Sequence, residues 1–238
     1  KGCFIGSVAI LIGPLIIGLF LLINGLLLWH NVSKVNILDN AYASMDVFFT
    51  ISPLIFLFFI PAVSMRTFSE EYNSETIETL VTKPITAFQI VFGKFLAILT
   101  VIFVSIFPTV LYIITIYFLG ETVGNIDLAG VIGSYIGLFL LSSIFASICV
   151  FASSLSNNQI IAFVLGIIIA TVFYFGFDLL SDFPLLQSID ILLQKRGISY
   201  HYNIMSKGLI RLSDVVYFSS ISFIFLKLSE VVILSKKQ

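Results

Sequence analysis

Six apolar segments of membrane-spanning length dominate the sequence. They cover roughly Ile5–Trp29, Val47–Met65, Phe95–Leu119, Leu128–Phe151, Ile160–Leu180 and Val215–Leu234. A helix needs about 20 predominantly apolar residues to cross the hydrocarbon core of a bilayer. Lipid offers no hydrogen bonds to the backbone, and the alternation of a membrane barrel is missing, so these segments predict helices. The expected fold is an all-α polytopic membrane protein with six transmembrane helices, residues 1–238 forming one domain.

The composition is typical of a chain dissolved in lipid. Hydrophobic residues make up 59% and charged residues 11%, against about 25% charged residues in ordinary soluble domains. The net charge of −1 gives no reason to expect a nucleic-acid partner. Cys3 and Cys149 lie in apolar segments and His30 and His201 are far apart, which predicts neither a disulfide framework nor a metal site. The start at Lys1 indicates that some N-terminal sequence is absent, and the first segment is too long for a signal-peptide core.

Charge counting leaves the orientation in the membrane open. Six spans put both chain ends on one side. If that side is the cytoplasm, six Lys and Arg residues lie inside and five outside, with Lys227 in the last span, which is a slight bias under the positive-inside rule.

The connection between the last two spans has a helical pattern of its own. Its apolar residues fall on one helical face, and Pro184 suits a first helical position; they are Leu185, Leu186, Ile189, Leu192 and Leu193. We expect an amphipathic helix at the membrane surface, then an aromatic turn at Tyr200–Tyr202. Ser213 and Asp214 are expected to cap the last span.

Residues 65–94 form the only long charged stretch between two apolar segments. They read MRTFSEEYNSETIETLVTKPITAFQIVFGK. Glu71 and Glu75 carry the same charge at helical spacing, and so do Glu75 and Glu78. Each such pair costs about a few tenths of a kcal/mol. A basic partner surface would relieve that cost. A solvated loop that only connects two spans is an equal alternative from the charges alone.

Three stretches, in this order, resemble the permeases of the ABC-2 type. They are RTFSEE at 66–71 with TIETLVTKPI at 76–85, ASSLSNNQIIAF at 152–163, and SKGLIRLSDVVYF at 206–218. The resemblance runs along nearly the whole chain. LLINGL at 21–26, ahead of NILD at 36–39, is similar to the permeases associated with bacterial gliding motility. One departure is Glu75, where relatives commonly have Gly before the Thr.

The resemblance implies the membrane half of an ATP-driven transporter. Residues 70–83 would contain a cytoplasmic coupling helix that rests on a separate ATPase subunit, and residues 154–159 would form a second contact. The implied coupling residues are Arg66, Glu70, Glu71, Thr76, Glu78, Lys83, Pro84, Ser156, Asn157, Asn158 and Gln159. Two ATPase copies, and a second permease that is identical or related, would complete the complex. The chain would lie in the bacterial inner membrane with both termini in the cytoplasm and lipid around it.

The chain itself is not expected to hydrolyse ATP. A phosphate-binding loop of the form G-x-x-x-x-G-K-[ST] is missing, because Phe95 follows Gly93-Lys94 and Phe88 stands where the first Gly belongs. No cofactor is therefore expected on this chain, and ATP and Mg would be bound by the partner ATPase.

Several residues inside the spans are candidates for a path or for helix packing. Polar residues that could line a translocation path are Asn24, Thr50, Ser52, Thr109, Thr171 and Tyr174; the alternative is bonding of each to its own helix. Pro14, Pro53 and Pro108 predict kinks. Lys227 and Glu230 predict an ion pair near a span end. Gly133-x-x-x-Gly137 with Gly130 predicts a close helix approach, within the chain rather than in a dimer.

Three other functions compete with an ATP-driven permease. A secondary transporter or channel is disfavoured because ionisable residues deep in the spans are scarce. An intramembrane enzyme lacks Gly-x-Ser-x-Gly, His-Glu-x-x-His or paired intramembrane Asp residues. A membrane anchor of a motility assembly that transports nothing stays open.

Overall fold

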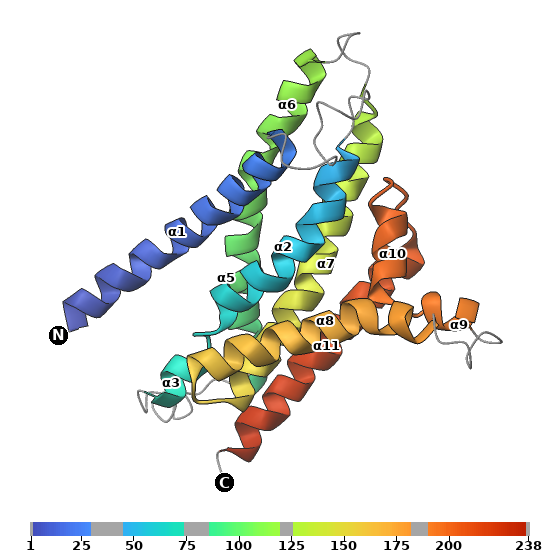
Figure 1. Ribbon diagram of the computed structural model, residues 1–238. Coiled ribbons are helices and arrows are strands. Elements are labelled where there is room, and N and C mark those ends of the chain that lie inside the picture. Colours follow the sequence, from blue (N-terminus) through green and yellow to red (C-terminus); the bar gives the residue numbers. More distant parts are fainter. Residues whose placement is uncertain (1, 30–44, 74–85, 120–125, 182–189, 237–238) are drawn as a thin grey trace.

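The computed structural model describes residues 2–29, 45–73, 86–119, 126–181 and 190–236, with backbone alone for residues 2–13, 73, 119 and 192. Every regular element in these ranges is helical (Figure 1). In order they are α1 Gly2–Trp29, α2 Asp46–Ser64, α3 Ser69–Asn73, α5 Ala87–Ile106, η1 Phe107–Thr109, α6 Val110–Leu119, α7 Leu128–Leu155, α8 Gln159–Ser181, α9 Asp190–Gln194, α10 Ile198–Met205 and α11 Leu212–Ser235. The all-helical class predicted from the apolar segments is confirmed for the described residues.

Five helical stretches within the described ranges are long and apolar enough to cross a membrane. They are Asp46–Tyr72, Ala87–Phe118, Leu128–Leu155, Gln159–Ser181 and Leu212–Ser235, which match the second to sixth predicted spans. The first predicted span lies within α1, whose apolar stretch Pro14–Trp29 is shorter than these five. A sixth span therefore stays a prediction.

The third span begins earlier than its apolar segment. Thr86 is the N-cap of α5, and its backbone N–H donates to Gln89 Oε1 at 3.0 Å while Gln89 N donates to Thr86 Oγ1 at 3.3 Å. This reciprocal capping box satisfies two N–H groups that a helix start leaves free. Because of it, α5 starts at Ala87 rather than at Phe95, and Lys94 lies inside the helix.

Helix α7 is the centre of the bundle. It packs against α2, α5, α8, α10 and α11, and 78% of its most apolar stretch is buried. Its many Gly, Ala and Ser residues let neighbouring backbones approach closely. The hydroxyls of Ser142 and Ser147 donate to carbonyls of the same helix at 2.7 and 2.8 Å, so their burial leaves no polar group unsatisfied.

The glycine stripe of α7 receives the end of α10 and the turn after it. A Cβ at Gly133 would lie 2.7 Å from Gly208 O, and one at Gly137 would lie 2.7 Å from Met205 Cβ. Gly208 itself has φ +80° and lies against Gly130. The prediction that this stripe packs within the chain is confirmed, although the partner is a short helix and a turn rather than another span.

Two predictions around α10 are wrong. Tyr200–Tyr202 lies within α10 rather than in a turn, because the buried Tyr202 hydroxyl donates to Phe49 O at 2.5 Å and fixes this helix against α2. Ser213 and Asp214 lie in the first turn of α11, whose N-cap is Arg211. Asp214 is buried, with Oδ1 2.7 Å from His201 Nδ1.

The surface helix predicted before α10 is described only in its last part. The structure has α9 over Asp190–Gln194, with Ile191 64% exposed. Pro184, Leu185, Leu186 and Ile189 lie outside the described residues, so the amphipathic helix they predict stays a prediction.

The three prolines act differently on their helices. Pro14 and Pro53 lie inside continuous helices α1 and α2. Pro108 lies in η1, which separates α5 from α6. Here Thr109 Oγ1 donates to Ile106 O at 2.6 Å and Tyr135 OH donates to Thr109 O at 3.1 Å. These side chains satisfy carbonyls at the break, so an interrupted helix is compatible with lipid.

Candidate functional site

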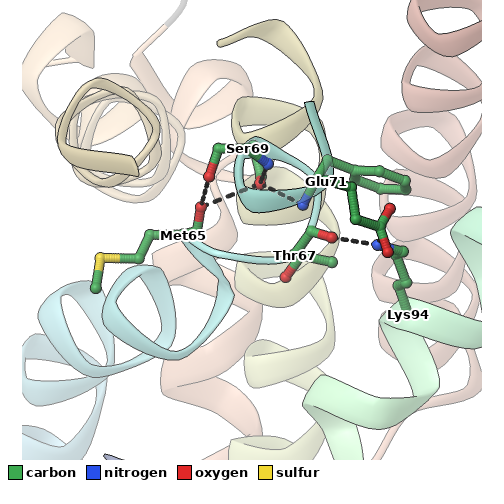
Figure 2. Close-up of polar contacts among 7 residues, drawn as sticks. Met65, Thr67, Ser69, Glu71 and Lys94 are labelled. Carbon is green, nitrogen blue, oxygen red and sulfur yellow. Dashed lines mark hydrogen bonds and ion pairs between the residues drawn. The ribbon is translucent and has the colours of Figure 1, made fainter. Parts of the chain in front are cut away.

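The chain turns sharply at the end of α2 and enters the short helix α3. A buried side chain of α7 holds this turn: Ser153 Oγ accepts hydrogen bonds from Phe68 N at 3.0 Å and Ser69 N at 3.3 Å and donates to Met65 O at 3.3 Å. Ser69 Oγ also donates to Met65 O (Figure 2). Because the first N–H groups of a helix lack intrahelical partners, Ser153 supplies what the start of α3 needs.

Lys94 of α5 holds the same turn from another side. Its ammonium donates to Thr67 O and lies 2.5 Å from Glu71 Oε2, as Figure 2 shows. It also lies 4.2 Å from the centroid of the Phe68 ring. The Lys94 and Glu71 side chains are 17% and 24% exposed, so this pair is much less screened than a surface ion pair. We call residues Met65–Asn73, held by Ser153 and Lys94, the anchored loop.

The turn between α7 and α8 is built by its own polar residues. Asn158 N donates to Ser156 Oγ at 3.0 Å, and Ile160 N donates to Asn158 Oδ1 at 2.8 Å. Asn158 therefore caps the start of α8, as Asn residues commonly do at helix N-termini. Asn157 and Asn158 are exposed and Gln159 is partly buried.

Lys236, at the end of α11, joins this turn to the anchored loop. Its ammonium lies 3.9 Å from the centroid of the Tyr72 ring. It also donates to Asn157 Oδ1 at 3.3 Å and to Leu155 O at 3.4 Å. Partial burial lowers the pKa of Lys236 from its ordinary value. α3, the α7–α8 turn and the end of α11 thus meet at one end of the bundle, which is the lower end in Figure 1.

The predicted coupling residues therefore divide into three groups. Arg66, Glu70 and Glu71 lie on the anchored loop. Ser156–Gln159 forms the α7–α8 turn, and Lys236 contacts both this turn and Tyr72 of the anchored loop. The others, Thr76, Glu78, Lys83 and Pro84, lie outside the described residues. Whether any of these residues contacts an ATPase stays a prediction.

Four residues of this site were not singled out from the sequence: Tyr72, Lys94, Ser153 and Lys236. Lys94 carried a usable signal, since a lysine at the start of an apolar segment needs a partner. Ser153 carried none, because serines are frequent in α7 and most of them bond to their own helix.

The six predicted path residues are scattered over the bundle. Asn24 Nδ2, Thr50 Oγ1 and Thr109 Oγ1 donate to carbonyls of Phe20, Asp46 and Ile106 at 2.9, 2.8 and 2.6 Å. Ser52 and Tyr174 are buried, and Thr171 is partly buried. The two clefts described between α2 and its neighbours are lined by none of these six residues. Their assignment to a translocation path stays a prediction.

The helices and the site are those of a multi-pass membrane protein whose polar loop elements gather at one end of the bundle. A family model described as ABC-2 family transporter protein matches residues 4–206, so the chain belongs to the ABC-2 family of transporter proteins. A search of curated proteins found no match. The family is a component of membrane transport that is not itself catalytic, and it normally works with an ABC ATPase.

Proposed function

We propose that this chain is the permease subunit of an ATP-driven transporter and couples ATP hydrolysis on a separate subunit to substrate movement across the bacterial inner membrane. Membership of the ABC-2 family supports this proposal. The observation that carries it is the anchored loop, in which Lys94 of α5 and Ser153 of α7 attach α3 firmly to the spans.

The attachment explains how a force on α3 would reach the spans. A pushed helix that is not fixed to its neighbours would only move its own loop. Here Ser153 transmits displacement of α3 to α7, which contacts α2, α5, α8 and α11. By linkage, a partner shifts the permease between two states only through contacts that differ between them. The anchored loop and the α7–α8 turn are our candidates for those contacts.

The finer arrangement follows from the same proposal. The end of the bundle that carries α3 faces the cytoplasm, and both chain termini lie on that side. The chain crosses the membrane six times. Two ATPase copies bind there, ATP and Mg being held by them, and a second permease, identical or related, completes the pathway. The resemblance of LLINGL at 21–26 and NILD at 36–39 to permeases of bacterial gliding motility supports the proposal that the complex works there.

The first test asks which chains accompany this one. The intact complex is purified from native membranes in mild detergent, and the proposal expects an ABC ATPase in it. Purification without any ATPase, combined with gradient-driven solute movement by the chain alone, would establish a secondary transporter instead. An ATPase-containing complex that moves no solute would support an anchor of a motility assembly.

The second test asks whether ATP hydrolysis depends on an opposite-charge pair at positions 71 and 94, or only on the charge of residue 71. In the reconstituted complex, Glu71→Lys should lower permease-dependent ATP hydrolysis to the level of the ATPase alone, because two like charges then face each other at the anchor. The swap Glu71→Lys with Lys94→Glu restores an opposite pair and should recover hydrolysis. Reversal of the Lys227–Glu230 pair, 2.8 Å apart on α11, is the control and should leave ATP hydrolysis unchanged. Unaltered hydrolysis in Glu71→Lys would contradict the proposed role.

A further inference from the structure

An open cleft of about 430 Å³ lies between the end of α2, with the turn after it, and the middle of α5. Its polar wall holds Arg66, Thr67 and the Glu71–Lys94 pair. Its apolar wall includes Ala97 and Val101, one and two turns further along α5. The cleft is therefore amphipathic, with charge at one end and hydrocarbon at the other.

The charge of the cleft is not balanced by its own residues. Glu71 pairs with Lys94 at 2.5 Å, which leaves the Arg66 guanidinium as the remaining charged group of the lining. Arg66 Nε is buried and has no hydrogen-bond partner among the described residues. A buried donor without a partner is costly, and natural structures rarely keep one without a reason. Guanidinium groups stay charged and match the oxygens of phosphate in geometry.

The position of the cleft limits what can fill it. Lys94 stands directly before the apolar segment that begins at Phe95, so the polar wall lies at the depth where hydrocarbon gives way to headgroups. Leu96 and Phe103, on the outer face of α5, are 45% and 57% exposed. Ala97, which lines the cleft, is exposed as well, so the cleft opens on the side of α5 where exposed apolar residues meet the bilayer.

We propose that this cleft binds an anionic membrane phospholipid, whose phosphate contacts Arg66 while an acyl chain lies along Ala97 and Val101. Basic pockets between membrane helices are a known form of headgroup site. The lipid would satisfy Arg66 Nε and cover the side of the anchored loop that Thr67 and Lys94 present to the cleft. The proposal does not depend on the ATPase, since it concerns only the chain and its bilayer.

Native mass spectrometry of the full chain tests this proposal with phosphatidylglycerol and phosphatidylcholine of the same acyl chains. Phosphatidylglycerol should bind more tightly than phosphatidylcholine. Arg66→Gln should raise the Kd for phosphatidylglycerol by at least about tenfold, because it removes one charge-assisted contact. Arg66→Lys should lose less, since the charge remains.

Arg211→Gln is the matched control, because Arg211 is an exposed arginine at the start of α11 with no side-chain capping bond. It should bind phosphatidylglycerol like the unmodified chain. Equal affinity of Arg66→Gln and the unmodified chain would overturn the proposal, as would equal binding of the two lipids. Displacement of phosphatidylglycerol by millimolar inorganic phosphate would assign the cleft to a small anion instead. If Arg66→Gln fails to fold, Arg66→Lys decides: a rise in Kd smaller than about tenfold with the preference over phosphatidylcholine kept supports the proposal, because the charge stays and the guanidinium fork is lost, and an unchanged Kd overturns it.

Discussion

Replacement of Lys94 by Met tests the anchored loop, since it removes the charge and keeps most of the side-chain volume. Three interactions are lost together: the bond to Thr67 O, the ion pair with Glu71 and the contact with the Phe68 ring. We expect α3 to detach from α5 while the spans stay folded, because Lys94 contacts the loop with its ammonium and the membrane-facing part of α5 is unchanged.

The expected magnitude follows from the burial of the pair. A hydrogen bond to a charged group contributes about 1.5–3 kcal/mol, and a cation over an aromatic ring about 0.5–1 kcal/mol. Removing one member of a fully buried ion pair costs about 3–5 kcal/mol. Because Lys94 and Glu71 are still 17% and 24% exposed, we take the lower end, about 3 kcal/mol. This free energy corresponds to a change of about a hundredfold in the local opening equilibrium.

Amide hydrogen exchange in lipid nanodiscs measures that equilibrium. The informative amides are Phe68 and Ser69, which donate to Ser153 Oγ, and Tyr72, which donates to Phe68 O. A helix as short as α3 has few bonds of its own and depends on tertiary contacts. In Lys94→Met these amides should exchange faster by up to about a hundredfold, while amides in the middle of α7 keep their rates.

Two further variants decide whether the reasoning holds. Lys94→Met with Glu71→Gln should recover part of the lost protection, because a neutral amide tolerates a half-buried site without the Lys94 ammonium better than a carboxylate does. Lys227→Met is the control: its ammonium pairs with Glu230 on α11 and lies over the Phe88 ring, so its loss should leave exchange in α3 unchanged. Unchanged exchange of Phe68 and Tyr72 in Lys94→Met would refute the reasoning. So would a double variant that exchanges faster than Lys94→Met.

Two other substitutions test neighbouring features. Ser153→Ala leaves two amides without their acceptor and should speed exchange in α3 by an amount equal to about 1–3 kcal/mol. Ser154→Ala, whose hydroxyl donates to Phe151 O of its own helix, should not; equal effects would contradict the anchor. Gly208→Ala should lower the melting temperature markedly, because φ is +80° and a Cβ would lie 2.4 Å from Gly130 Cα, costing at least about 1–3 kcal/mol. Gly18→Ala, with nothing within 4 Å of its Cβ, is the control, and similar melting temperatures for the two variants would refute the packing.

The spans could be predicted because lipid imposes a simple rule on the sequence. An apolar segment of sufficient length becomes a helix wherever it lies, so the second to sixth segments were located from composition alone. The start of α5 was misplaced because hydropathy marks where hydrocarbon begins, and the helix begins at the Thr86–Gln89 capping box instead. That motif was legible in the sequence, and Thr86 follows closely after Pro84, where a helix start is common.

The contacts between distant residues could not be predicted in the same way. The acidic stretch indicated a basic partner, and the resemblance implied an ATPase contact for Glu71, which stays a prediction. The pair that Glu71 forms with Lys94 of the same chain was not predicted. Likewise Tyr200–Tyr202 was predicted to be a turn, because the burial of Tyr202 depends on Phe49 of α2, which lies far away in the sequence. Tertiary packing decides these cases, and hydrophobic patterning carries no information about it.

Site-specific photo-crosslinking tests most directly whether an ATPase binds at the end of the bundle that carries α3. A photoreactive amino acid replaces Asn157, an exposed residue of the α7–α8 turn, or Asn203, an exposed residue of α10. In the intact complex with ATP, the account predicts an adduct between position 157 and the ATPase and none from position 203. An adduct from position 203, with none from position 157, would show that the ATPase binds away from the end of the bundle that carries α3 and would contradict the account.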